Sequence, residues 1–581
     1  MSSNDQATRE SFVPEQETSS MQKAPTRRQG LHGCCSSLLG GIYGCRWKKH
    51  VPPPSTACDL IWFFLLLLFT AVITISLYLW LVIENDEANF NTYLHNKTGI
   101  RFRWYTLMLI STSIAFSYIA LLLVLSLCHS VLKLQLYMHH VNRVFLVLLT
   151  LLFGGIMVVV GVMEKQEWQL VRLSLHMTGP FLQVAAVVLA TILTWLFVVR
   201  WVKLTVAALR AFLLVLYISF MMFLYLSPLL ISAPCICHDN EVPVKPKLFA
   251  HRGASMVAPE NTMAAFEYAI ENGCYGLESD VGITLDGVPV MLHDTTLGRT
   301  TNVADVFPGR VDDPIWRFTA DEVSLLSAGQ WFLDQDPYHQ VSKLTKKQKR
   351  QYRKQTVPTL AEFLTFAKSH KTRIMFDIKV YNENGTVLKK VLETVKDSRI
   401  PRKNVYWIKT DNKTLARSTL VASTFSSPRV RHLRDNKYSV INVRYDVLKE
   451  STIREYSESN IETIIYIVNT DWLYSFYWCL GVDYVTTDNV DELRKMQSPI
   501  WHIQPLTYLI MWVTVDVVSV LLVIIIWSTY IYRQYKSNVP LESIPLEHAN
   551  LNFTKAKRYV IDDADNSWMD SFKERKSLTR L

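Results

Sequence analysis

Six long stretches of the chain consist almost entirely of apolar residues, with no polar face recurring at helical spacing. Each is about 20 residues or longer, the length that a helix needs to cross about 30 Å of hydrocarbon. Buried helices of soluble proteins are seldom so long or so uniformly apolar. The pattern therefore predicts six membrane-spanning helices, at Leu60–Ile83, Tyr105–Cys128, Val144–Met163, Pro180–Val199, Ala211–Ile231 and Leu506–Ile531.

Between the fifth and sixth of these stretches the pattern changes to short apolar runs that alternate with amphipathic helical stretches. The strand candidates are Leu248–His251, Gly276–Asp280, Pro289–His293, Arg373–Ile378, Val405–Lys409, Val440–Val443, Thr463–Val468 and Asp483–Thr486. The helical stretches include Thr262–Asn272, Thr359–Lys368, Thr386–Val395 and Asp471–Leu480. Eight strands in about 250 residues are typical of a (β/α)8 TIM barrel. A doubly wound sheet is the alternative, but no Gly-rich phosphate-binding loop follows the first strand.

These patterns predict five regions. Residues 1–58 are rich in Ser, Gln, Thr and Pro and predict a disordered tail. Five transmembrane helices occupy residues 59–231, and an α/β barrel domain occupies residues 232–504. The sixth transmembrane helix follows at 505–531, and a polar tail at 532–581 ends the chain.

Composition supports a membrane protein, because 49% of the 581 residues are hydrophobic and only 19% are charged. This balance excludes a disordered, collagen-like or disulfide-dense small protein. The net charge of +10 is also compatible with a nucleic-acid partner. However, the Lys and Arg residues are scattered or lie beside apolar runs, where anionic membrane lipid is the better partner. We therefore expect no nucleic-acid partner.

The basic residues that flank the spans predict the orientation. Arg46, Lys48 and Lys49 precede the first span, and Arg533 and Lys536 follow the last, so both termini are expected to be cytoplasmic. With six spans the barrel is then extracellular or lumenal. Lys97, Arg101 and Arg103 in the first loop oppose this orientation. The glycosylation sequons support it, because three fall on the outer side, at Asn96, Asn384 and Asn412, and one falls inside, at Asn552.

The cysteines divide by their expected compartment. Four of them, Cys235, Cys237, Cys274 and Cys479, would face an oxidising compartment, where one or two disulfides are expected. Four cysteines allow three full pairings, and the sequence does not choose among them. A zinc site is the weaker alternative, because Cys235 and Cys237 have the wrong spacing and no second pair follows. Near the first span, Cys34, Cys35 and Cys45 are either palmitoylated or reduced thiols.

Polar residues that can perform chemistry lie where the predicted barrel strands end. Glu278 and Asp280 are two apart on one strand, so their side chains point to the same face. Asp377 ends another strand and is a candidate third ligand. Carboxylate oxygens suit a hard divalent cation such as Ca²⁺ or Mg²⁺. Because active sites of such barrels lie at the C-terminal strand ends, we expect these three side chains to converge on a metal.

Two histidines complete the predicted chemistry. His251 and His293 each end a predicted strand within a polar cluster. A neutral and a protonated imidazole can act as general base and general acid. Arg252 offers a planar fork for phosphate oxygens, and Lys379 offers a compact positive charge. A metal with these four side chains predicts a phosphodiester hydrolase.

Ordered motifs from Leu248 to Asn489 resemble the glycerophosphodiester phosphodiesterase family. They are His251-Arg-Gly-Ala, Pro259-Glu-Asn-Thr, Gly276-Leu-Glu-Ser-Asp-Val, Asp286-Gly-Val-Pro-Val, His293-Asp-Thr-Thr-Leu-Gly-Arg-Thr-Thr, Leu326-Ser-Ala-Gly-Gln-Trp-Phe, Val357-Pro-Thr-Leu-Ala-Glu and Val482-Asp-Tyr-Val-Thr-Thr-Asp. The layout of five spans before this domain and one after it resembles the six-transmembrane mammalian group of that family.

The resemblance implies hydrolysis of glycerophosphodiesters to glycerol 3-phosphate and an alcohol, with Glu260 near the site. Two positions depart from the family's motifs. Asp377 stands where the family usually has Glu, so the third metal ligand is one methylene shorter. Tyr466 stands in place of Trp and keeps an aromatic platform for the substrate. The first departure puts metal affinity in doubt.

Other functions remain as alternatives. The same chemistry can act on glycerophosphoinositol or on glycosylphosphatidylinositol anchors, and a catalytically weak surface signalling protein is a different class. Only the intramembrane Asp516 favours a channel or transporter. Arg210 is a conceivable partner for this carboxylate. The basic run Lys346–Lys354 is either a solvated helix or an attractor of anionic lipid.

Overall fold

The computed structural model describes residues 41–44, 56–131, 135–163, 165–378, 386–408, 419–423 and 426–537. These residues form two compact units. The first contains the described residues up to Met177 together with Ala233–Ile503, and the second contains Thr178–Ser232 together with the described residues from Gln504 onward.

Six helical segments in the described part of the chain are long and apolar enough to cross a membrane, which confirms the six predicted spans. The protein is therefore a multi-pass membrane protein. The helices that build these segments are α2 (Ala57–Val82), α3 (Glu87–Thr98), α4 (Trp104–Val131), α5 (His140–Met163), α6 (Lys165–Val202), α7 (Ala207–Leu226) and α19 (Pro505–Ser537). A short 3₁₀ turn, η1 (Ile83–Asp86), joins α2 to α3.

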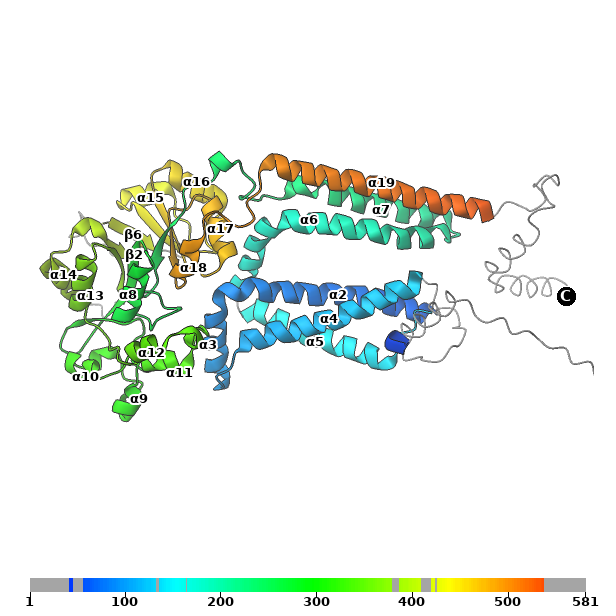
Figure 1. The fold of residues 1–581 in the computed structure, drawn as a ribbon. Coiled ribbons are helices and arrows are strands. Elements are labelled where there is room, and N and C mark those ends of the chain that lie inside the picture. The colour runs from blue at the N-terminus through cyan, green and yellow to red at the C-terminus, as the bar shows by residue number, and fades with distance from the viewer. Residues whose placement is uncertain are drawn as a thin grey trace, which may run out of the picture. The chain divides into compact units, whose positions relative to one another are not determined.

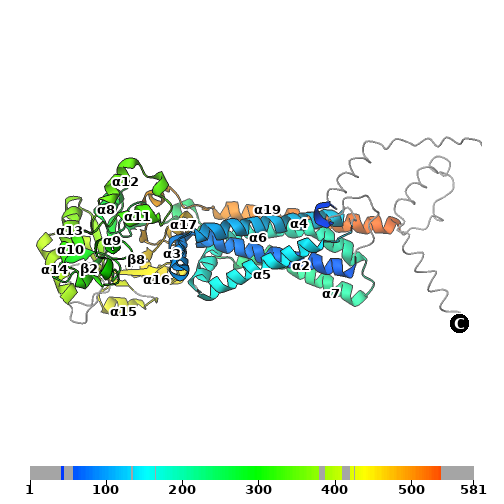
Figure 2. The ribbon, with the colours of Figure 1, turned by 90° about the horizontal axis from the view of Figure 1, so that it is seen from below.

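In the first unit, α2 packs against α4 and α5, and the three helices run side by side in both views (Figure 1, Figure 2). Thr56 starts α2 with a capping box, in which its hydroxyl accepts from the Asp59 backbone N–H. The contact is apolar and includes Leu66, Ile119 and Leu146, all fully buried. Asp59 is itself buried and forms an ion pair with Arg143.

The second unit contains the later part of α6 together with α7 and α19. Hydroxyl groups join these helices, since Thr191 Oγ1 and Ser519 Oγ lie 2.5 Å apart and the Tyr225 hydroxyl lies 2.8 Å from Ser519. Among the described residues, Arg210 forms no ion pair with Asp516, and its guanidinium lies over the Trp201 ring instead. The conceivable partnership between Arg210 and Asp516 is therefore wrong.

The described residues of the barrel domain form nine strands, and eight of these make a closed parallel barrel. They are β1 (Lys247–Ala250), β2 (Gly276–Ile283), β3 (Pro289–Met291), β4 (Arg373–Ile378), β5 (Val405–Ile408), β6 (Thr419–Ser423), β7 (Val440–Arg444), β8 (Glu462–Tyr466) and β9 (Tyr484–Thr487). Their order is β1-β9-β8-β7-β6-β5-β4-β2-β3, and β1 also pairs with β2. That last pairing closes the ring and confirms the predicted (β/α)8 fold.

One predicted strand needs correction, and one barrel strand was not predicted. The third candidate, Pro289–His293, forms β3, but β3 is antiparallel to β2 and stands outside the ring. Its turn contains Asp286 and Gly287, with Gly287 at φ +81°, and such Asp-Gly turns favour hairpins. The missing eighth barrel strand is β6, which pairs with β5 and β7. The sequence did not predict β6 because its apolar run, Leu420–Ala422, is very short.

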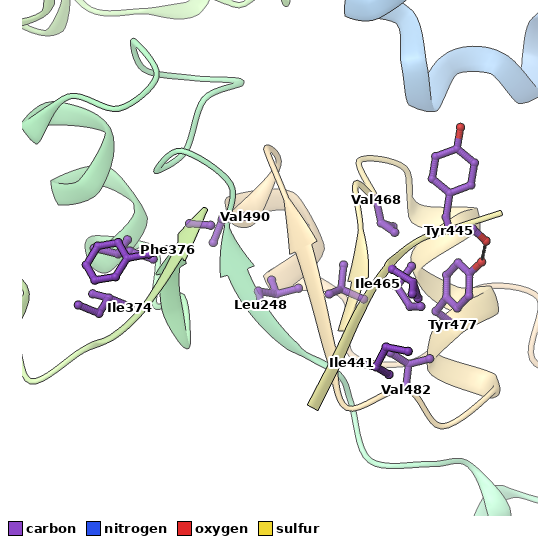
Figure 3. Packing of buried hydrophobic residues seen from close by; sticks show 14 of the residues in the cluster. Leu248, Ile374, Phe376, Ile441, Tyr445, Ile465, Val468, Tyr477, Val482 and Val490 are labelled. Atoms are coloured by element: carbon purple, nitrogen blue, oxygen red, sulfur yellow. Dashed lines mark hydrogen bonds between the residues drawn. The ribbon is translucent and has the colours of Figure 1, made fainter. Parts of the chain in front are cut away.

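Helices follow the barrel strands and lie outside them, as α8, α13 and α14 show (Figure 1). They are α8 (Met263–Glu271), α13 (Leu360–Ser369), α14 (Thr386–Ser398), α15 (Val430–Asp435), α16 (Glu450–Glu458), α17 (Asp471–Cys479) and α18 (Val490–Lys495). Thr359 begins α13 with a capping box that includes Glu362. The core between strands and helices includes Leu248, Phe376 and Ile465, all nearly or fully buried (Figure 3).

The described segment between β3 and α13 contains four short α-helices. They are α9 (Val303–Val306), α10 (Ala320–Ser324), α11 (Gln330–Gln335) and α12 (Lys346–Arg353). The predicted basic run thus forms α12, which Thr345 caps. Its Tyr352 is buried against Phe332, while the Lys and Arg side chains lie on the other faces. This is the arrangement of a solvated helix anchored by one aromatic residue.

One disulfide joins Cys235, before the first strand, to Cys479 at the end of α17. Cys237 and Cys274 are free thiols. The structure therefore selects one bond from the pairings that the sequence left open. The predicted acylation candidates Cys34, Cys35 and Cys45 lie outside the described residues.

Candidate active site

The barrel interior consists of two layers, an aromatic and aliphatic layer and a polar layer above it. The lower layer includes Phe249, Met375, Tyr406, Ile464 and Tyr484. Side chains of a strand alternate between faces, so the residues two or four positions further along point into the barrel as well. Those positions hold His251 after β1, Asp377 in β4, Tyr466 in β8 and Asp488 after β9. Three predicted site residues, His251, Asp377 and Tyr466, therefore share the C-terminal mouth of the barrel with Asp488.

The loop after β1 turns sharply because two successive residues adopt left-handed backbone conformations. Arg252 has φ +52° and Gly253 has φ +82°. A Cβ on Gly253 would lie 2.6 Å from the Ala265 Cβ, so the position requires glycine. The turn directs the Arg252 backbone N–H to Glu278 Oε2, at 3.0 Å. The His-Arg-Gly sequence thus links the first strand to the acidic second strand.

His251 is paired with a carboxylate that the sequence analysis did not assign. Its Nδ1 lies 2.6 Å from Asp488 Oδ1, and the side chains are 15% and 5% exposed. Burial opposes the charged imidazolium, but the Asp488 carboxylate outweighs it and raises the pKa of His251. Asp488 also accepts hydrogen bonds from Ser255 Oγ and from Asn469 Nδ2. These donors orient the carboxylate toward the histidine.

The two acids of β2 are both buried. Glu278 is 5% exposed and Asp280 is 2% exposed. Burial and the neighbouring Asp280 carboxylate raise the pKa of Glu278 to about 7. Arg252 Nε lies 3.4 Å from Asp280 Oδ2, and Asn261 Nδ2 donates to the same oxygen at 3.2 Å. Two buried carboxylates of like charge suit a cation, which would relieve their repulsion.

Asp377 is the register partner of Asp280 on the neighbouring parallel strand β4. Parallel register partners point to the same face, so Asp377 and Asp280 both point into the barrel. However, no group of three or more His, Cys, Asp or Glu side chains in the described part of the chain is arranged to hold a metal ion. The donors present thus fit a carboxylate pair better than a complete three-carboxylate site.

His293 belongs to a network of charged residues. Its Nδ1 lies 2.7 Å from Asp294 Oδ1, and Asp294 also accepts from Arg299. Arg299 donates two hydrogen bonds of 2.8 Å to Glu260, and Arg252 Nη1 donates to Glu260 at 3.0 Å. This series of contacts connects His293 to Arg252, the residue next to His251.

Glu260 stays ionised at the centre of that network. Burial alone would raise its pKa, but the guanidinium groups of Arg252 and Arg299 lower it to about 2. Its carboxylate accepts hydrogen bonds from both arginines and so restricts their orientation. The guanidinium of Arg252, predicted to bind phosphate, contacts Glu260 and Asp280 here and its side chain is 17% exposed.

The structure describes Tyr466 but not Lys379, the two other residues predicted to bind substrate. Tyr466 ends β8, and the barrel places it at the mouth. Burial raises the pKa of its hydroxyl above the ordinary value, so the phenol is neutral. Lys379 lies outside the described residues.

A cavity of about 270 Å³ opens beside His251 and Arg252. Ile467, Asn469 and Asp488 line it from the barrel. The opposite lining comes from residues 84–89, at the end of the first span, and from Tyr338 of the segment between β3 and β4. His293 and the predicted metal ligands are not among the residues that line this cavity. The cavity therefore covers only the His251 side of the proposed site.

Sequence analysis missed several residues of this site. Asp488 closes the motif that begins at Val482, and its position after the last strand was the available signal. Arg299 lies in the motif that begins at His293, and Asn469 lies three positions after Tyr466, but their partners are distant along the chain. Asn85 lies two positions after the first predicted span, Leu60–Ile83, and no sequence pattern connects it to the barrel.

The fold and the site define a membrane-bound (β/α)8-barrel hydrolase. The model of the glycerophosphoryl diester phosphodiesterase family matches residues 251–492. Human glycerophosphodiester phosphodiesterase domain-containing protein 5 is 37% identical over 84% of this chain and 82% of its own length. The chain belongs to the glycerophosphoryl diester phosphodiesterase family and is a phosphoric diester hydrolase.

Other relatives refine the comparison. Human glycerophosphoinositol inositolphosphodiesterase GDPD2 is 35% identical over 87% of this chain and 95% of its own length. From its sequence we predicted that the chain looks most like domain-containing protein 4. That prediction is wrong, because the mouse protein 4 is only 29% identical over 85% of this chain and 84% of its own length. A solved phosphodiesterase from Oleispira antarctica, in complex with sn-glycerol-3-phosphate, is 20% identical, with a TM-score of 0.36 over 43% of this chain and 95% of that one.

Proposed function

We propose that this protein is a membrane-anchored ecto-phosphodiesterase that hydrolyses glycerophosphodiesters to glycerol 3-phosphate and an alcohol. The observation that carries the proposal is the buried pair of His251 and Asp488, 2.6 Å apart, next to Arg252 and the carboxylates of β2. An acid–base histidine beside a phosphate-binding cation and an acidic pair is suited to phosphodiester hydrolysis.

In the proposed reaction His251 is the general acid. Asp488 holds its Nδ1–H and favours the imidazolium, which leaves Nε2–H to protonate the departing alkoxide. His293 is the general base. Asp294 accepts from its Nδ1, so Nε2 is left to take a proton from the attacking water. The phosphorus forms one P–O bond with the oxygen of the attacking water, and its P–O bond to the departing alcohol breaks. His293 takes one proton from the water, and His251 gives one proton to the alcohol.

Glu278 and Asp280 would hold a divalent cation, Ca²⁺ or Mg²⁺, and Asp377 is the proposed third ligand from the adjacent strand. When bound, such a cation supplies positive charge to the phosphate oxygens. Arg252 and Lys379 are proposed to bind phosphate oxygens as well, and the Tyr466 ring is proposed to pack against the glycerol or alcohol portion. This arrangement neutralises the charge that develops on phosphate.

A second candidate substrate is glycerophosphoinositol, which the name of the human GDPD2 relative favours. Membrane lipid and glycosylphosphatidylinositol anchors are further candidates, because the barrel belongs to a protein with six spans. We place the barrel on the extracellular or lumenal side and both termini in the cytoplasm.

A product assay tests the proposal. The full-length protein in detergent would be incubated with Ca²⁺ or Mg²⁺ and with glycerophosphodiesters that carry choline, ethanolamine or inositol. We expect release of glycerol 3-phosphate, or of an inositol phosphate from the inositol diester, and loss of both products in His251→Ala. If neither product is released from any of the diesters with either metal, the proposed function is contradicted and a catalytically silent surface protein is favoured.

A further inference from the structure

The end of the first membrane span enters the active-site region of the barrel. Val82, the last residue of α2, belongs to the same buried cluster as Val468 and Tyr445 of the barrel. Residues 84–89 then line the cavity that reaches His251. Figure 3 shows the Tyr445 ring pointing toward the blue ribbon of this segment, where its hydroxyl donates to Asp86 Oδ2 at 2.6 Å.

Asn85 makes the most specific contact in this region. Its side chain is buried, at 4% exposure, although it belongs to the short turn η1. Asn85 Oδ1 accepts from the Asn469 backbone N–H at 2.8 Å. Its Nδ2 donates to the Ile467 carbonyl at 3.1 Å. One amide thus satisfies both a donor and an acceptor of the loop after β8.

The loop that Asn85 holds orients the partner of His251. Asn469 Nδ2 donates to Asp488 Oδ2 at 2.8 Å, and Asn469 Oδ1 accepts from the Asp488 backbone N–H at 2.9 Å. Asp488 Oδ1 in turn contacts His251 Nδ1 at 2.6 Å. The contacts therefore run without interruption from the first span through Asn469 and Asp488 to the proposed general acid.

We propose that Asn85 is a positioning residue for the reaction, through which the first membrane span holds Asn469, Asp488 and His251 in their working geometry. This inference rests on the proposed function of His251. It also means that the barrel is not catalytically independent of the first span. Removing a buried hydrogen bond from such a series misplaces the acid without removing any reacting group.

A double-mutant cycle in the full-length protein tests the inference. Asn85→Ala should lower kcat about tenfold, with KM within about twofold, because one buried hydrogen-bonded group is lost. Asn469→Ala removes the next contact, to Asp488. In that background Asn85→Ala should change kcat by less than about twofold, because the two residues act in one series. If the double variant instead loses kcat by the product of the two single-variant factors, the inference is overturned.

Tyr445→Phe is the matched control. It removes a hydrogen bond between the same turn, η1, and the loop after β7, and that bond is not in the series that leads to His251. Tyr445→Phe should change kcat by the same factor in the wild-type protein and in Asn469→Ala, whatever the size of that factor. If Asn85→Ala fails to fold, Asn85→Asp serves instead, because a carboxylate oxygen can still accept from the Asn469 N–H. Asn85→Asp should then have a kcat closer to wild type than Asn469→Ala has.

A readout that needs no turnover separates this inference from the proposed function. Diethyl pyrocarbonate modifies accessible imidazoles, and mass spectrometry gives the rate at each histidine. Asn85→Ala should increase the modification rate of His251 several-fold and leave that of His293 unchanged. If wild type hydrolyses no diester but this change occurs, the proposed function fails and the positioning role stands. If wild type is active and Asn85→Ala alters neither kcat nor modification, the positioning role fails and the function stands.

Discussion

His251 and Asp488 lie 237 positions apart in the chain, yet their side chains meet at 2.6 Å. They meet because β1 and β9 are neighbours in the closed barrel, with Ala250 aligned to Thr487. Each residue follows directly after its strand, so the pairing of β1 with β9 also brings the proposed acid and its partner together. The neighbouring position of β1 and β9 is thus a condition for the proposed acid catalysis.

Asp488→Asn tests this pair through the pH dependence of activity. The carboxylate raises the pKa of His251, so its loss should lower that pKa. A general acid must be protonated, hence activity falls as pH rises through its pKa. The alkaline limb of kcat/KM should therefore move to lower pH in Asp488→Asn, and the maximal kcat should fall about 10²-fold. An unchanged alkaline limb would show that Asp488 does not control His251.

Much of this site could be predicted from local sequence. His251 directly follows β1, whereas Glu278 and Asp280 lie within β2, two positions apart and therefore on one face of the strand. The barrel followed from the number of strands, although β3 was counted in the ring in place of β6. That exchange left the total at eight, because an antiparallel hairpin strand and a short buried strand have similar apolar patterns.

The contacts that orient the site could not be predicted in the same way. Glu260, Arg299 and Asn469 have partners that are set by loop conformation and by barrel closure. The Asn85 contact joins a membrane span to a loop 384 residues later. Hydrophobic periodicity carries no information on such pairs.

Removal of the acidic pair tests the proposed metal. Glu278→Ala or Asp280→Ala deletes an anionic oxygen ligand, and chelation removes the ion, so each should lower hydrolysis at least about 10²-fold. Glycerol 3-phosphate release before and after chelation measures the effect, and added Ca²⁺ or Mg²⁺ should restore it in wild type only. Full activity after exhaustive chelation would show that these carboxylates have another role.

Glycan mapping tests the orientation. Asn96 is exposed on α3, whereas Asn384, Asn412 and Asn552 lie outside the described residues. If the barrel is extracellular or lumenal, the first three should carry glycans and Asn552 should not. Enzymatic deglycosylation should lower the mass of the expressed protein, and Asn384→Gln with Asn412→Gln should remove most of that shift. A mass that deglycosylation does not alter would argue for the opposite orientation.

The disulfide gives an independent test of the compartment. Cys235→Ser should lower the free energy of unfolding by about 2–4 kcal/mol, because the bond closes a long loop of the chain. Cys237→Ser is the matched control, since Cys237 is a free thiol in the same segment. Chemical denaturation followed by tryptophan fluorescence measures both variants. Equal stability of the two variants would mean that the bond does not form in the compartment that the barrel faces.

Asp377 decides between an enzyme and a catalytically silent surface protein. It is aligned with Asp280 on the neighbouring strand and is one methylene shorter than the Glu expected at this position. Metal distances tolerate only about 0.2 Å of error, so Asp377 should bind through water or after a backbone shift.

Asp377→Glu should therefore lower the metal concentration for half-maximal activity about tenfold, while His251→Ala still abolishes turnover at saturating metal. The first change tests the ligand distance and the second tests proton transfer, so a metal titration of glycerol 3-phosphate release in both variants separates the two roles. If wild type and Asp377→Glu are both inactive at saturating metal on every diester, and a protein partner still binds His251→Ala, the barrel acts as a receptor. If Asp377→Glu instead leaves the metal requirement unchanged, Asp377 is no ligand, and Glu278 and Asp280 hold the ion with other oxygens.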